Sequence, residues 1–337
     1  METTIMSVDF LLGAGYTIVL IALVLFVVLT LAAYLVLLER KLLGRMQLRY
    51  GPNRVGPFGL LQPLADGVKL LLKEDLVPDG AERFIFLIAP AMMALVTFIG
   101  FAFIPLGGDI TIFGHTLPFV VSNLDVGLLV ILALSSIGVY GVALGGWASN
   151  NKFSLLGAVR GAAQMISYEL PLSLSLVPII MLSGSLSLVD IVNAQASYPF
   201  ILVQPLAFII FFISALAESK RIPFDLPEAE NELQAGFHTE YSGMRFALFF
   251  LGEYVNMILL GALVAVFFLG GWRGPLLPGP VWLFIKIMIV PILLIWTRGT
   301  LPRFRYDQLM HFCWKVLVPL ALVNIVFTGI VLVAMGS

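Results

Sequence analysis

Charged residues are scarce in this chain of 337 residues: Asp, Glu, Lys and Arg together make up 12% of it. Hydrophobic residues make up 60%, and the mean hydropathy is +1.03. So few charges exclude an ordinary soluble domain, and several apolar runs exceed the ~18 residues typical of a membrane-spanning helix. The first run is too long for a cleaved signal peptide, and no small-residue cleavage site follows it. We therefore expect a polytopic membrane protein.

The sequence also lacks the motifs that hold redox or nucleotide cofactors. Its single cysteine, Cys313, excludes an intrachain disulfide and a cysteine-based metal site. No Cys-x-x-Cys, Gly-x-Gly-x-x-Gly or Walker-type loop is present. The three histidines are scattered, and we interpret them as interfacial or loop residues: His115, His238 and His311. We expect no metal, nucleotide, haem or iron–sulfur cluster to be bound by this chain, and no nucleic acid partner.

The apolar runs predict an all-α fold with eight transmembrane helices in a single membrane domain, residues 1–337. The expected spans are about Ala14–Leu38, Phe84–Ile104, Leu124–Gly146, Ala162–Leu182, Phe200–Ala217, Phe246–Leu269, Trp282–Thr297 and Phe312–Ala334. Lys and Arg lie almost entirely in the odd-numbered loops, and the opposite loops hold only Arg273. The positive-inside rule then places both termini on the outer, periplasmic side.

A segment of the first inside loop has a different pattern. Between Phe58 and Lys73, apolar residues share one helical face, and the opposite face carries Gln62, Asp66 and Lys69. This pattern predicts an amphipathic helix that lies in the membrane surface. A helix packed under a soluble partner remains an alternative, and both can hold.

The loop between the fifth and sixth spans, about residues 218–245, concentrates negative charge. Six of the chain's twenty acidic residues lie between Glu218 and Glu240. Pro223 and Pro227 fix their own φ angles and favour extended geometry in the residues before them. We interpret the segment as a shaped carboxylate surface at the membrane face, with a merely solvated acidic loop as the alternative.

Further acids lie inside predicted spans. Glu169 and Glu253 lie about seven residues from the inside ends of spans four and six, roughly 10 Å deep. Glu218 closes span five and Glu39 closes span one. Acids at similar depth on several spans predict a hydrated polar cavity whose groups exchange protons. Static ion pairing between helices is the alternative.

Span one, the amphipathic helix and span six could border a long apolar slot. We expect its inner end to be polar, near Arg40, Arg49 and the Phe224-Asp225 turn. Such a slot suits an amphiphile with an apolar tail and a polar head group. Ordinary positive-inside anchoring is the alternative for the two arginines.

Four motifs closely resemble one family, the H subunit of respiratory complex I, the NADH–quinone oxidoreductase, whose mitochondrial counterpart is NADH dehydrogenase subunit 1. The resemblance covers essentially the whole chain. Its motifs are Glu39-Arg40-Lys41, the segment Gln47–Asn53 (QLRYGPN), the segment Gly59–Lys69 (GLLQPLADGVK) and the segment Ile222–Glu230 (IPFDLPEAE).

The resemblance implies a heel subunit of the membrane arm, in a bacterial inner membrane or, if organellar, the mitochondrial inner membrane. It implies quinone as substrate, with FMN and iron–sulfur clusters held by partner subunits. The implied partners are the peripheral quinone-site subunits, the small membrane-arm subunits leading to the antiporter-like subunits, and membrane lipid. By analogy, the quinone path involves Arg40, Arg49, Phe224 and Asp225. The acids implied in proton coupling are Glu169, Glu218, Asp225, Glu228, Glu230 and Glu253.

One departure from the family concerns span three. Some relatives carry an acid there, whereas the inner-half polar groups of this chain are Ser135, Ser136 and Tyr140, which puts a relay through span three in doubt. Two other functions remain open: the related membrane subunit of a membrane-bound hydrogenase, and a secondary transporter, although neither inverted repeats nor broken helices are evident.

Overall fold

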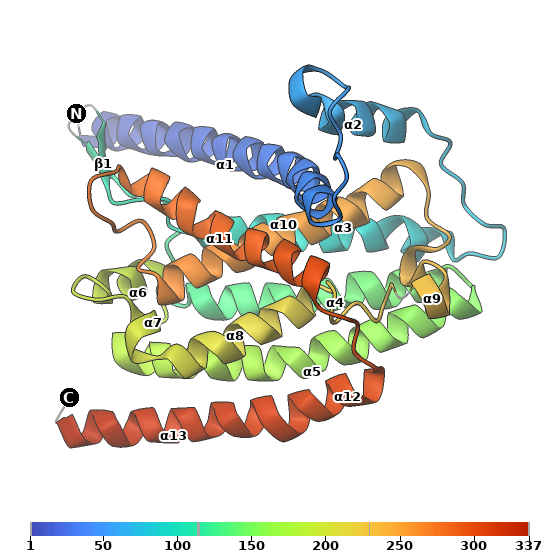
Figure 1. Cartoon of the computed structure of the whole chain (residues 1–337). Helices are drawn as coiled ribbons and strands as arrows, with labels where there is room; N and C mark the ends of the chain where they lie inside the picture. Colours follow the sequence, from blue (N-terminus) through green and yellow to red (C-terminus); the bar gives the residue numbers. More distant parts are fainter. Residues whose placement is uncertain (1, 113–114, 229, 336–337) are drawn as a thin grey trace.

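The computed structural model describes residues 2–112, 115–228 and 230–335, and it is built almost entirely of helices (Figure 1). The helices are α1 (Glu2–Met46), α2 (Gln62–Leu72), α3 (Arg83–Gly100), α4 (Gly127–Ala148), α5 (Lys152–Ser183), α6 (Leu188–Ala194), α7 (Phe200–Val203), α8 (Pro205–Glu218), α9 (Glu230–Leu233), α10 (Gly243–Phe268), α11 (Gly279–Thr300), α12 (Tyr306–Phe312) and α13 (Val318–Met335). A short antiparallel hairpin, β1 (Ile110–Ile112) and β2 (His115–Leu117), was not predicted from the sequence.

Seven helical segments of the described residues are long and apolar enough to cross a membrane: α1, α3, α4, α5, α10, α11 and the continuous segment Tyr306–Met335. They correspond to seven of the eight predicted spans, so the prediction of a helical, multi-pass chain is confirmed. The start of α1 and the end of α13 lie at the same end of the molecule (Figure 1).

The predicted fifth span, Phe200–Ala217, is divided into α7 and α8. The break falls at Gln204–Pro205, where the proline has no N–H to donate to the preceding turn. Gln204 is buried and bonds to α13, donating to Thr328 Oγ1 at 2.9 Å and accepting from Asn324 Nδ2 at 3.1 Å. With 14 residues, α8 alone spans about 21 Å, less than the ~30 Å hydrocarbon core.

The central helix of the fold is α10. It is apolar on all sides and almost wholly buried from Gly252 to Phe268, as expected of a helix surrounded by protein. It packs against α3, α11 and α1. Gly261 makes the contact with α11 possible, because a Cβ at this position would lie 2.5 Å from the carbonyl oxygen of Ile287.

The amphipathic helix predicted at 58–73 is α2, which begins four residues later at Gln62. None of its residues is buried, and Leu64, Val68 and Leu71 expose an apolar face. Its polar face is turned toward α1, where Asp66 pairs with Arg40 at 2.7 Å. The helix lies beside the end of α1 that is remote from the N-terminus (Figure 1).

Candidate functional site

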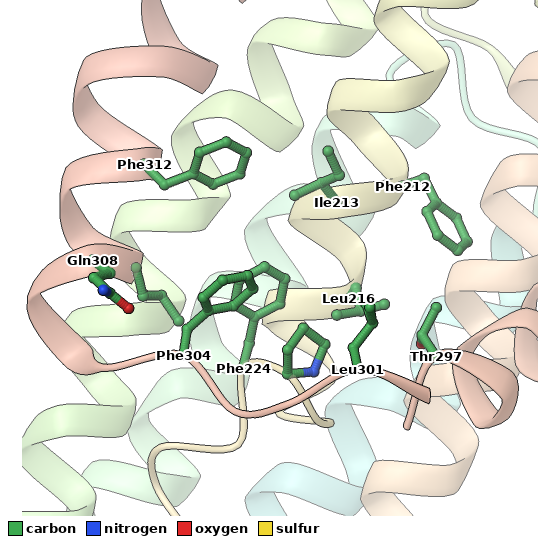
Figure 2. Close-up of a pocket in the computed structure, with 11 residues that line it drawn as sticks. Phe212, Ile213, Leu216, Phe224, Thr297, Leu301, Phe304, Gln308 and Phe312 are labelled. Carbon is green, nitrogen blue, oxygen red and sulfur yellow. The ribbon is translucent and has the colours of Figure 1, made fainter. Parts of the chain in front are cut away.

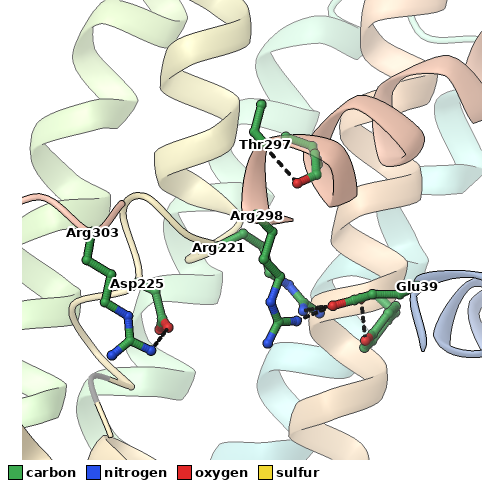
Figure 3. A network of polar contacts seen from close by, with 8 residues as sticks. Glu39, Arg221, Asp225, Thr297, Arg298 and Arg303 are labelled. Atoms are coloured by element: carbon green, nitrogen blue, oxygen red, sulfur yellow. Dashed lines mark hydrogen bonds and ion pairs between the residues drawn. The ribbon is translucent and has the colours of Figure 1, made fainter. Parts of the chain in front are cut away.

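Charged side chains from distant parts of the chain converge on Glu39, near the end of α1. Arg221 Nη1 lies 3.1 Å from Glu39 Oε1, Arg298 of α11 pairs with the same oxygen, and the Tyr254 hydroxyl of α10 donates to Oε2 at 2.6 Å (Figure 3). Glu39 is 3% exposed. A carboxylate so buried requires this pairing, because an isolated buried charge is costly. Glu39 therefore joins α1, α10, α11 and the loop after α8.

Lys220, which precedes Arg221 in the loop after α8, makes a second buried ion pair. Lys220 Nζ lies 3.2 Å from Glu253 Oε1, and their side chains are 2% and 6% exposed. The ammonium also lies over the Phe237 ring, 4.8 Å from its centroid. The loop after α8 thus turns two adjacent cations into the helix bundle, one toward each buried acid.

The predicted acidic turn continues this network. Asp225 Oδ2 accepts from Arg303 Nη2 at 2.9 Å, while the buried Oδ1 has no hydrogen-bond partner among the described residues (Figure 3). Burial raises the pKa of Asp225 to about 6, although the charge of Arg303 opposes the rise. Asp225 is therefore a carboxyl group whose charge depends on its surroundings near neutral pH.

Glu228 lies close to Glu253, and its Oε1 is 3.9 Å from His238 Nδ1. Burial and the neighbouring negative charge of Glu253 raise the pKa of Glu228 well above its ordinary value. Asp225, Glu228, His238 and the Arg298 and Arg303 side chains line a polar cavity of about 380 Å³. The turn and the two ion pairs thus form one connected polar region.

Gln164 holds the acidic turn in place from α5. Its fully buried Nε2 donates to the carbonyl oxygens of Ala217 at 2.8 Å and Phe224 at 2.7 Å. These two bonds fix the end of α8 and the start of the turn relative to α5. Sequence analysis did not identify Gln164, and a polar residue inside an expected span was the signal available.

Phe224 lines an apolar cavity of about 580 Å³ between α8, α11 and α12, whereas its neighbour Asp225 lines the polar cavity (Figure 2). Its ring stacks on Phe304 with centroids 5.7 Å apart, and Leu216 and Phe312 line the same cavity. The turn therefore presents an aromatic side chain to one cavity and a carboxylate to another.

A third cavity, of about 470 Å³, lies between α1, α2 and α10, the three elements expected to border an apolar slot. Apolar side chains line most of it, with Arg40, Asp66, Lys69 and Tyr254 as its polar groups. The expected inner end differs, because Phe224 and Asp225 line other cavities. Tyr254 connects this cavity to Glu39.

Two predicted site residues stand apart from these cavities. Arg49 is exposed and donates to Gln47 Oε1 at 2.8 Å, and it lines none of the three cavities described above. Glu230 begins α9, and its side chain lies outside what the structure describes.

The acids Glu169 and Glu218 lie on α5 and at the end of α8. The helix α5 begins at Lys152, ten residues before the predicted span, so Glu169 lies near the middle of this 32-residue helix. Ser136 of α4 donates to Glu169, and Ser135 donates to Glu218. The structure thus places these two acids on neighbouring sides of α4.

Sequence analysis noted Glu39 as the end of the first span but did not include it among the site residues. Arg221, Arg298 and Tyr254 were not among the predicted site residues either. They lie 182, 259 and 215 residues from Glu39 along the chain. The signal available in the sequence was an acidic residue, Glu39, at the end of an apolar run.

Comparison with known proteins shows the family of the chain. The family model described as NADH dehydrogenase matches residues 18–329. The chain is 67% identical to the second NADH-quinone oxidoreductase H subunit of Syntrophobacter fumaroxidans, over 96% of this chain and 98% of the relative. It is 65% identical to the second H subunit of Geobacter sulfurreducens, over 93% and 95%, and 58% identical to the H subunit of Syntrophotalea carbinolica, over 97% and 99%. The chain belongs to the H subunit family of NADH-quinone oxidoreductase, respiratory complex I.

Proposed function

We propose that this chain is the heel subunit of a proton-pumping complex I, through which quinone enters and its reduction is coupled to proton movement. The observation that carries the proposal is the cluster of buried ion pairs around Glu39, Glu253 and Asp225, which adjoins apolar cavities. Buried charges in a membrane protein are costly and typically mark a substrate or proton pathway.

The cavity between α1, α2 and α10 is the proposed entrance for quinone. Its apolar walls suit an isoprenoid tail, and Arg40 supplies a cationic group at its polar end. Arg49, exposed on the loop after α1, would contact the peripheral subunits or the incoming head group. Phe224 and Asp225 would shape the inner part of the path from opposite sides of one turn.

The acids form the proposed coupling path. Burial raises the pKa of Asp225 to about 6 and raises the pKa of Glu228 well above its ordinary value, so both carboxyl groups are candidates for proton uptake. Glu230, Glu253, Glu218 and Glu169 would continue the path from the turn into the bundle. A change of charge on a bound quinone would then change which of these acids hold a proton, because neighbouring charges shift one another's protonation.

The proposed placement follows from the distribution of Lys and Arg. In it α7 and α8 cross the membrane together, which gives eight crossings with both termini on the periplasmic side of a bacterial inner membrane. The apolar face of α2 lies in the membrane surface. Partner subunits hold FMN and the iron–sulfur clusters, dock at the acidic turn, and continue the membrane arm toward the antiporter-like subunits.

Glu169→Gln tests the coupling role, because it removes the ionisable group and keeps the side-chain volume. We expect the assembled variant complex to lose most of its quinone-dependent proton pumping in inverted membrane vesicles. Glu232→Gln is the matched control, since Glu232 is a 59% exposed acid paired with Arg160. Full pumping by an assembled Glu169→Gln complex would make Glu169 a structural residue.

A further inference from the structure

Two consecutive serines in α4 each contact a different acid. Ser135 Oγ donates to Glu218 Oε1 of α8, and Ser136 Oγ donates to Glu169 Oε1 of α5. Successive residues of an α-helix are rotated by about 100° around its axis, so adjacent hydroxyls can face two neighbouring helices. The sequence of α4 contains no acidic or basic residue. The helix nevertheless contacts both carboxylates.

These hydroxyls are important partners of the two acids. Among the residues that the structure describes, neither Glu169 nor Glu218 lies within ion-pair distance of a basic side chain. Glu218 is buried beside a small cavity lined mostly by apolar side chains, such as Ile131 and Leu172. In such surroundings a carboxylate that loses its hydrogen-bond donor is strongly disfavoured.

The geometry around Ser136 suits both charge states of Glu169. A serine hydroxyl carries one hydrogen and two acceptor lone pairs. Ser136 Oγ also lies 3.2 Å from the carbonyl oxygen of Leu132, four residues earlier in the helix. When Glu169 is ionised, the hydroxyl donates to the carboxylate. When Glu169 holds a proton, the hydroxyl can turn to Leu132 and accept from the carboxyl group instead.

We infer that Ser135 and Ser136 are positioning residues of the coupling path, which hold Glu218 and Glu169 in place through proton uptake and release. The inference rests on the proposed function and names the part that α4 plays in it. It also gives span three, which is α4, a part in the coupling path although this span carries no acid. A purely structural role, in which the serines only join packed helices, would be independent of the protonation state of either acid.

The test uses the assembled complex carrying Ser135→Ala or Ser136→Ala. We expect each variant to lower coupled quinone reduction about tenfold, the factor that corresponds to the loss of one hydrogen bond to a charged group. Infrared difference spectra of quinone reduction should show a shifted carboxyl band. Glu218→Gln and Glu169→Gln identify these bands by abolishing them. Ser→Thr at each position retains the hydroxyl and should restore both the rate and the band.

Ser175→Ala is the matched control, because among the residues that the structure describes the buried Ser175 of α5 bonds only to the carbonyl oxygen of Leu172. It should leave rate and spectrum unchanged. If an alanine variant fails to assemble, Ser→Cys keeps the volume with a weak donor and should show the same loss. Wild-type rates and bands in the alanine or cysteine variants would overturn the inference. If the glutamate variants lose activity while the serine variants do not, only this inference fails; if both glutamate variants are fully active, the proposed coupling path fails.

Discussion

Individual charges in this chain are positioned by partners that are remote in sequence. The cations that neutralise Glu39 come from the loop after α8 and from the end of α11. Sequence analysis could identify acids in apolar runs, because a carboxylate there is unusual. It could not assign their partners, since the pairing depends on how helices pack and which face of each turns inward.

Glu39→Gln tests how strongly the buried network stabilises the protein. The change leaves Arg221 and Arg298 without a counter-charge, and breaking a buried ion pair costs about 3–5 kcal/mol. We expect a clearly lower midpoint of thermal unfolding for the variant complex in lipid nanodiscs. The matched control is Asp66→Asn, whose pair with Arg40 is 29% and 46% exposed and should contribute about 0–1 kcal/mol. Equal midpoints for the two variants would contradict the structural role assigned to Glu39.

The length of the apolar runs identified most helices of this fold. The ends of the helices depend on caps and prolines, which the length of a run does not reveal. The predicted fourth span is about Ala162–Leu182, whereas the helix α5 that contains it begins at Lys152, where Asn151 caps the helix by accepting from the backbone N–H of Phe153 at 2.9 Å. The break between α7 and α8 was also missed. Pro205 lies within an otherwise continuous apolar run, and Gln204 finds its partners on α13.

Cysteine accessibility tests the orientation of these helices. In a Cys313→Ala background, Asn123→Cys should react with a membrane-impermeant thiol reagent from the periplasmic side. Lys152→Cys should react only when the cytoplasmic side is opened. The physical reason is the positive-inside distribution of Lys and Arg. Both target residues are exposed in the structure, so folding does not hide them. The reverse labelling pattern would contradict the proposed topology.

At the level of the whole molecule, one end of the bundle brings together three cavities, the two buried ion pairs of Glu39 and Glu253, and the partly exposed pair of Asp225. The apolar cavities border α1, α2, α8, α10, α11 and α12, and the polar cavity lies at the acidic turn. In the proposed function, this region serves both quinone access and proton exchange. The motif resemblance named Phe224 and Asp225 as site residues, but it did not predict that these neighbours line two different cavities.

The most direct measurement compares two activities of the assembled complex carrying Asp225→Asn or Glu228→Gln. NADH oxidation by a soluble artificial acceptor reports the peripheral arm alone, whereas NADH-to-quinone activity also requires this chain. Neutralising either carboxyl group removes a proton-binding site whose pKa is raised, with little change in volume. Asp307→Asn is the control, because its pair with Arg305 is solvent-exposed.

We expect NADH-to-quinone activity to fall roughly tenfold or more in both variants, as for the loss of a group that transfers protons, while activity with the artificial acceptor persists. Peripheral subunits that stay on the membrane would assign the loss to quinone or proton chemistry, and subunits that wash off would assign it to docking at the turn. Unchanged quinone reduction in both variants, with normal assembly, would contradict a functional role for the acids of this turn.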